Sequence, residues 1–142
     1  MVAAATERSA AEPFGLVVNG EAGEWAEALE KIVGRQWVET YRVGKDREVL
    51  DLVEAGVADA AVLDEGAIEA EPLHLLRDIR RRNQTLLVVL LTRTTVDRRW
   101  LEEALRLTAF SVVIKPLRLE ELLVQVHRMM MRFDALMRGE AF

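Results

Sequence analysis

The chain has 142 residues and a formal net charge of -5, so it is long enough to bury the core of one domain. The acidic balance argues against nucleic-acid binding, and the absence of cysteine excludes disulfides and cysteine-bound zinc. No apolar run is long enough to span a membrane and no secretory signal opens the chain, so we expect a cytoplasmic protein whose residues 1–12 form a loose tail.

Short apolar runs alternate with longer segments along the rest of the chain. The runs cover residues 15–18, 37–43, 60–63, 86–91 and 112–114. Between them, apolar residues recur every three or four positions, as at Trp25, Leu29 and Ile32, which is helical spacing. The runs are continuous rather than alternating, which is typical of strands covered by helices on both faces. The sequence therefore predicts an α/β fold with a doubly wound, five-stranded parallel sheet.

Polar residues stand at the ends of these predicted strands, where open parallel sheets bind their ligands. Residues 19–21 follow the first strand, and residues 64–66 follow the third. Thr92 ends the fourth strand, and Lys115, followed by Pro116, ends the fifth. A carboxylate from Asp64, a hydroxyl and an ammonium group are therefore expected to converge on one edge of the sheet. Strand ends are often polar in such folds, so this spacing alone demands no chemistry.

The order of Asp64, Thr92 and Lys115 resembles the receiver domain of two-component response regulators, which has a flavodoxin-like fold. The resemblance covers residues 14–128, and residues 73–80 look like the third helix of that family. It implies a receiver-like domain over residues 13–128. It also implies that Asp64 is the residue that accepts a phosphoryl group from a histidine kinase. Thr92 and Lys115 would then contact the phosphoryl oxygens, and the Lys115–Pro116 peptide bond would be cis.

Two departures from the family pattern concern the metal and the readout of phosphorylation. The family ends its first strand with two acidic magnesium ligands, where this chain has Asn19 and Gly20. Asp64, the Gly66 carbonyl and, less well, Glu21 or Glu65 remain as ligands, so any Mg²⁺ binding is expected to be weak. An aromatic residue that reports phosphorylation is replaced by Val112. Asp64 could instead be a leftover carboxylate paired with Lys115.

The last segment predicts a long amphipathic helix over residues 119–137. Its apolar stripe consists of Leu122, Val126, Met129, Met130, Phe133, Leu136 and Met137. A receiver needs only the first half of such a helix to cover its sheet, so we expect residues 129–142 to form an extension that projects into solvent. An exposed stripe of this kind favours a homodimer or a helical partner. The alternative is that the extension folds back over its own domain.

Two functions from different classes remain open. The first is a stand-alone, atypical receiver that acts as a phosphorylation-independent interaction and dimerisation module, with no enzymatic activity and no cofactor. The second is a working single-domain response regulator that is phosphorylated on Asp64 by a histidine kinase. Neither hypothesis involves nucleic acid or a membrane.

Overall fold

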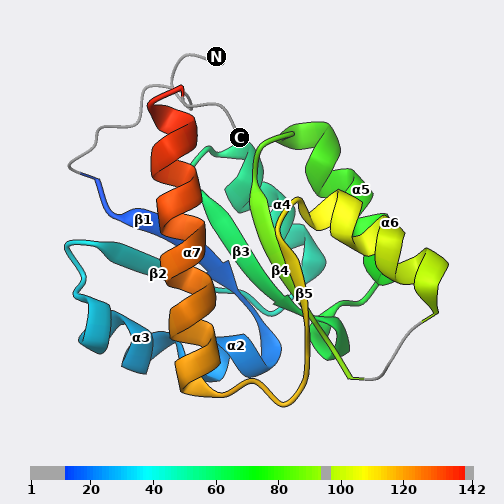
Figure 1. The fold of residues 1–142 in the computed structure, drawn as a ribbon, viewed down its shortest axis with the longest axis horizontal. Coiled ribbons are helices and arrows are strands. Elements are labelled where there is room, and N and C mark those ends of the chain that lie inside the picture. Colours follow the sequence, from blue (N-terminus) through cyan, green and yellow to red (C-terminus); the bar gives the residue numbers. More distant parts are fainter. Residues whose placement is uncertain (1–11, 94–96, 140–142) are drawn as a thin grey trace.

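The computed structural model describes residues 12–93 and 97–139. Within them, five strands form one parallel sheet in the order β2-β1-β3-β4-β5 (Figure 1). The strands are β1 (Phe14–Val18), β2 (Val38–Arg42), β3 (Ala60–Asp64), β4 (Leu87–Thr92) and β5 (Ser111–Ile114). The helices are α2 (Gly20–Glu24), α3 (Ala26–Val33), α4 (Asp46–Glu54), α5 (Pro72–Arg82), α6 (Arg98–Thr108) and α7 (Leu119–Met137), and a short 3-10 turn, η1 (Glu65–Ala67), follows β3. The predicted fold class is confirmed; of the predicted tail, only Glu12 lies within the described residues.

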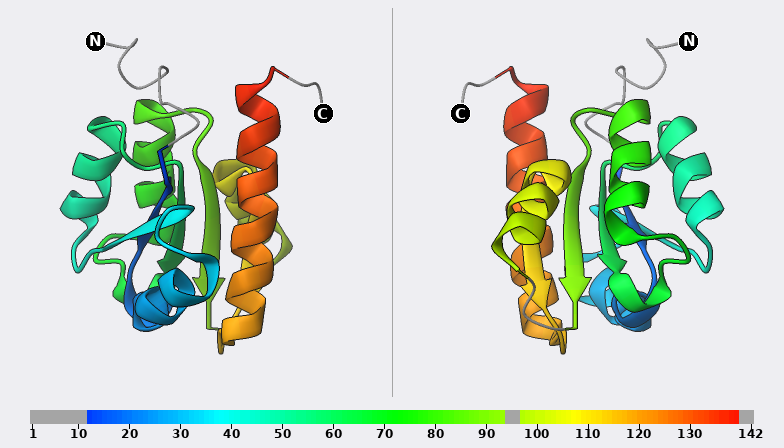
Figure 2. Two further views of the ribbon diagram at one scale, coloured as in Figure 1. Left: turned by 90° about the vertical axis from the view of Figure 1, so that its left-hand side faces the viewer. Right: turned by 90° about the vertical axis from the view of Figure 1, so that its right-hand side faces the viewer.

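Helices cover both faces of the sheet. α7 lies on one side, and α4 and α5 lie on the other (Figure 2). α2 and α3 share the face of α7, and α6 completes the opposite face. Because successive residues of a strand point to opposite faces, Leu16 and Val18 pack toward α7 while Val17 packs toward α4 and α5. β1, β3 and β4 are buried along their whole length, which explains their continuous apolar sequences.

Arg80 fastens the end of α5 to the neighbouring loops. Its guanidinium group donates to the backbone carbonyls of Asn83, Gln84, Leu86, Leu107 and Thr108. These carbonyls belong to the α5–β4 connection and to the end of α6. A planar group with five donors suits this arrangement, whereas a lysine could reach only part of it.

The C-terminal helix packs along its own sheet, which contradicts the predicted projecting extension. Leu122, Val126 and Met129 are 0%, 1% and 0% exposed, because they belong to the core cluster that fills this face. Met130 and Phe133 pack against the same cluster, and the ring of Phe133 meets the ring of Phe14 edge-to-face at 5.5 Å. These five residues therefore cannot form the seam of a dimer in this arrangement.

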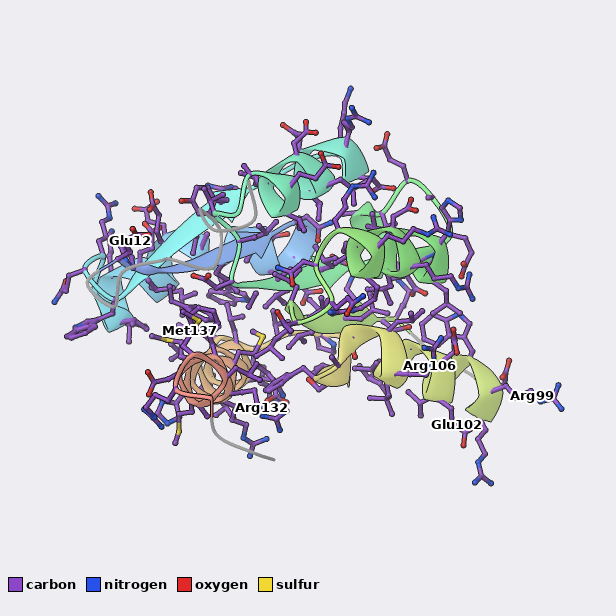
Figure 3. The ribbon with its side chains drawn as sticks, turned by 90° about the horizontal axis from the view of Figure 1, so that it is seen from above. Glu12, Arg99, Glu102, Arg106, Arg132 and Met137 are labelled. Carbon is purple, nitrogen blue, oxygen red and sulfur yellow. The ribbon has the colours of Figure 1, made fainter. Side chains whose placement is uncertain are left out.

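α7 also runs without a break through the boundary that we expected after residue 128. The structure favours the alternative in which the segment folds back over its own domain. Of the predicted seam, only Leu136 and Met137 remain largely exposed, at 36% and 49%. Figure 3 looks along this helix, with Met137 and Arg132 labelled on it beside the sheet. Among the described residues, no helix is both long and apolar enough to cross a membrane.

Candidate functional site

The predicted site residues meet at the carboxyl edge of the sheet, as the strand order requires. Asp64 ends β3, Thr92 ends β4 and Lys115 follows β5, while α2 begins soon after β1. A shallow pocket lies at this edge. Its lining residues are Gly20, Glu21, Glu24, Asp64, Gly66, Ala67, Arg93 and Lys115. The pocket is therefore lined by three acidic and two basic side chains.

The Asp64 carboxylate is enclosed by hydrogen-bond donors of the protein itself, and its side chain is only 6% exposed. Oδ1 accepts a hydrogen bond from Lys115 Nζ at 2.9 Å and another from the Gly66 amide at 2.9 Å. Oδ2 accepts one from the Glu21 amide at 2.8 Å. Both carboxylate oxygens are thus engaged by the folded chain.

These contacts determine the charge states of Asp64 and Lys115. Burial opposes the charge of Asp64, but hydrogen bonds from Lys115 and from the Glu21 and Gly66 amides outweigh it and lower the pKa of Asp64 below its ordinary value of 3.8. The hydrogen bond to Asp64 in turn raises the pKa of Lys115 above 10.5. Both groups are therefore charged at neutral pH. The Lys115–Pro116 peptide bond is cis, as expected from the resemblance.

Asn19 and Gly20 occupy the two positions where the resemblance implies acidic metal ligands. Asn19 is 3% exposed, and its side-chain oxygen accepts a hydrogen bond from the Asp64 backbone amide at 2.6 Å. Gly20 has a φ of 51°, and a Cβ at this position would lie 2.5 Å from Oδ2 of Asp64 and 2.7 Å from its Cβ. A carboxylate at position 20 would therefore displace Asp64. The glycine allows α2 to approach Asp64 closely enough for the Glu21 amide to reach it.

The oxygen atoms at this edge do not form a site that would bind a magnesium ion firmly. Mg²⁺ requires a near-octahedral shell of oxygens, with carboxylates free to coordinate it. The side-chain oxygen of Asn19 already accepts a hydrogen bond from the Asp64 amide. Oε1 of Glu21, a predicted ligand, accepts one from the Leu117 amide at 2.6 Å. The Gly66 amide donates to Asp64 Oδ1 and so takes up part of the remaining carboxylate. Over residues 12–93 and 97–139, no group of three or more His, Cys, Asp or Glu is arranged to hold a metal.

Glu21 connects this pocket to α7. Besides its contact with Leu117, its Oε2 lies 3.5 Å from Lys115 Nζ. The Leu117 carbonyl accepts a hydrogen bond from the Trp25 indole at 3.1 Å, so both backbone groups of Leu117 are held. Leu117 lies two residues before α7 and is 4% exposed. The start of α7 is therefore fixed by the residue whose amide binds Asp64.

Thr92 ends β4 at the same edge of the sheet, as predicted, but its hydroxyl is already paired. Its Oγ1 donates to Oε1 of Glu65 at 3.1 Å, and the Arg93 amide donates to the same oxygen at 3.3 Å. Thr92 is 1% exposed. The Glu65 carboxylate thus accepts hydrogen bonds both from the last residue of β4 and from the residue that follows it.

Sequence reasoning placed Asp64, Thr92, Lys115 and Gly66 at one edge, and the structure brings all four there. It missed the hydrogen bonds made by the side chains of Asn19, Trp25 and Glu65. Glu65 gave a partial signal because it directly follows the strand that ends in Asp64. The Trp25 contact spans 92 positions and left no pattern in the sequence.

No protein-family model matches the sequence, and no curated protein matches it. Solved structures do match. A signal receiver domain from Vibrio parahaemolyticus has 14% identity and a TM-score of 0.74, covering 92% of this chain and 99% of that one. A two-component response regulator from Clostridium difficile has 16% identity and a TM-score of 0.68, covering 85% and 98%. The receiver domain of the TMAO respiratory system response regulator TorR has 24% identity and a TM-score of 0.69, covering 86% and 100%.

These similarities define the class of fold. The chain has the fold of response-regulator receiver domains, with a five-stranded parallel sheet and a long last helix. Identities below 25% extend to the fold alone, so function is argued below from the residues.

Proposed function

We propose that this chain is an atypical receiver module of bacterial signal transduction that works through protein contacts, without phosphorylation of Asp64 and without catalytic turnover of its own. The receiver fold supports the signalling class. One observation supports the mechanism: both oxygens of Asp64 already accept hydrogen bonds from Lys115, Gly66 and Glu21. The carboxylate is therefore committed to holding the fold at this edge.

Phosphorylation would require Asp64 to give up part of this network. An oxygen of Asp64 would have to form a bond to phosphorus while the bond from phosphorus to the donor breaks. Hydrogen bonds to a charged group contribute about 1.5–3 kcal/mol each, so losing one or two of them raises the barrier substantially. The incoming phosphoryl group would also approach Glu21 and Glu24, whose negative charges line the pocket.

The test is covalent labelling of the full chain by acetyl phosphate with magnesium, followed by intact mass measurement. We expect no phosphoryl adduct on the natural chain under conditions that label a receiver with a complete acidic pair. The Asp64→Asn variant identifies any adduct that forms elsewhere. Rapid, stoichiometric labelling of the natural chain that is absent from Asp64→Asn would overturn the proposal.

The second candidate is a working single-domain response regulator that accepts a phosphoryl group on Asp64 from a histidine kinase. The observation in its favour is that Asp64 is ionised and lies 2.9 Å from Lys115, with Thr92 at the same edge. An ionised carboxylate is the nucleophilic form. The labelling experiment separates this candidate from the first directly.

We further propose that the protein contact is with a second copy, through the outer α7 face: Val124, Arg128, Met131 and Ala135. Val124 and Met131 are 43% and 61% exposed although both are apolar. α7 begins with Glu120 and Glu121 and carries Arg128 and Arg132 further along, while Asp134 near its end is paired with Arg138. In a two-fold dimer with antiparallel helices, the acidic start of each helix would lie beside Arg128 and Arg132 of the other. The beryllofluoride-activated receiver domain dimer of NtrC4 is among the solved structures with a similar fold, at 14% identity and a TM-score of 0.69.

Oligomeric mass in solution tests this contact. We expect Met131→Glu to shift the chain from dimer to monomer. Ile32→Glu is the matched control, because Ile32 is a similarly exposed apolar residue, at 57%, on α3 rather than on α7, and its replacement should leave the mass unchanged. A monomeric natural chain at every concentration, or an equal effect of both variants, would contradict this part of the proposal.

A further inference from the structure

Glu65 occupies a position that the proposed function leaves unexplained. It directly follows Asp64 and opens η1, and its side chain reaches across to the end of β4. There, one carboxylate oxygen accepts the Thr92 hydroxyl at 3.1 Å and the Arg93 amide at 3.3 Å. A hydroxyl and an adjacent backbone amide that point at one oxygen form a geometry suited to an oxyanion.

The third donor at this edge is occupied in the same way. Lys115 Nζ lies 2.9 Å from Asp64 Oδ1 and 3.5 Å from Glu21 Oε2. The Thr92 hydroxyl, the Arg93 backbone amide and the Lys115 ammonium group are therefore each paired with a carboxylate of the chain itself. Among the described residues, no buried side-chain nitrogen or oxygen lacks a hydrogen-bond partner.

We propose that the Glu65 carboxylate is a built-in anion that fills the Thr92–Arg93 donor pair and so excludes external oxyanions such as phosphate. This inference rests on the proposed function and supplies its residue-level cause on the β4 side of the pocket. Glu65 has an advantage over a free anion because it is covalently attached at the end of the neighbouring strand. Its local concentration near Thr92 and Arg93 therefore exceeds that of an anion in solution. A phosphate ion would also have to enter beside Asp64, Glu21 and Glu24, which adds repulsion.

A purely structural role, in which Glu65 only ties η1 to β4, predicts a different result when Glu65 is replaced. If the carboxylate only braces the turn, its removal leaves a looser loop with no new affinity. If it occupies an anion site, its removal opens that site. Binding of inorganic phosphate to the variant therefore separates the two roles.

The experiment follows the Arg93 backbone amide of the full chain by two-dimensional NMR. In Glu65→Ala, we expect hydrogen exchange at this amide to accelerate about tenfold or more, because a charge-assisted hydrogen bond is lost. Glu65→Gln keeps a neutral acceptor oxygen, and its exchange rate should lie between those of the natural chain and Glu65→Ala. Glu24→Ala is the matched control, since it removes an acidic side chain from the same pocket without touching Thr92 or Arg93.

Titration with inorganic phosphate then completes the test. We expect saturable shifts of the Arg93 amide in Glu65→Ala and none in the natural chain or in Glu24→Ala. The inference is wrong if the natural chain responds as strongly as Glu65→Ala, if Glu65→Ala does not respond, or if Glu24→Ala responds equally. Failure of this inference is therefore distinguishable from failure of the proposed function, which would appear as covalent labelling of Asp64 in the natural chain.

Discussion

Replacing Met129 by alanine tests whether the second half of α7 belongs to the core. Met129 is 0% exposed and packs in the cluster between α7 and the sheet. Truncating a buried methionine to alanine costs about 2–5 kcal/mol, from the lost burial and the cavity that remains. Met131 is two residues further along the same helix and is 61% exposed, so its truncation should change the free energy of unfolding of the monomer, measured in dilute protein, by no more than about 0.5 kcal/mol.

The pair forms a controlled comparison because the same substitution is made twice in one helix. Any gain in helix propensity from alanine is common to both variants and cancels in the difference. Urea unfolding gives the free energy of each variant, and an unchanged slope shows that the unfolded state is comparable. A projecting extension predicts two small and similar effects. Equal effects of Met129→Ala and Met131→Ala would therefore refute the packing of α7 described above.

Three further predictions concern the pocket and the end of α5. Gly20→Ala should destabilise the fold by about 1–3 kcal/mol, because φ is positive at this position and the new Cβ would clash with Asp64. Gly23→Ala is the control: it has open space around the new Cβ and should be neutral or slightly stabilising in the same urea measurement. Because the pKa of Asp64 is lowered, its stabilising contribution is complete above pH 3.8 and is lost as the pH falls through the folded-state pKa. The free energy of unfolding of Asp64→Asn, measured across acidic pH, should lack that part of the pH dependence. Arg80→Ala should cost about 2–4 kcal/mol, since it leaves several carbonyls unpaired, while Arg81→Ala removes only an exposed pair with Asp78 and should cost less than about 1 kcal/mol; thermal or urea unfolding of the two variants checks this.

The fold could be predicted because its strongest signals are local and repeated. β1, β3 and β4 are buried on both faces, and burial on both faces is what a continuous apolar run records. The three site residues that end strands were found for the same reason, since the position of a residue in a parallel strand fixes its edge of the sheet. Asp64, Thr92 and Lys115 needed no long-range information beyond the strand order.

The packing of the C-terminal helix was predicted wrongly because an apolar stripe in a sequence does not identify the surface against which it packs. Leu122, Val126 and Met129 recur with a spacing that suits both a partner helix and the chain's own sheet. The deciding fact is the position of Phe14, whose ring meets that of Phe133. That contact joins residues 119 positions apart, and periodicity in one segment carries no information about it. The roles of Trp25 and Arg80 escaped for the same reason.

The contacts at the pocket form one connected structure rather than a set of leftover residues. The Glu21 amide binds Asp64 while the Glu21 side chain holds Leu117 before α7, so the charge pair and the last helix share a residue. In a phosphate-driven receiver, an external anion would change what this edge binds. Here Asp64 neutralises Lys115, and Glu65 takes the donors of β4. With the Thr92, Arg93-amide and Lys115 donors paired internally, this edge presents one arrangement to α7, as the proposed phosphorylation-independent function requires.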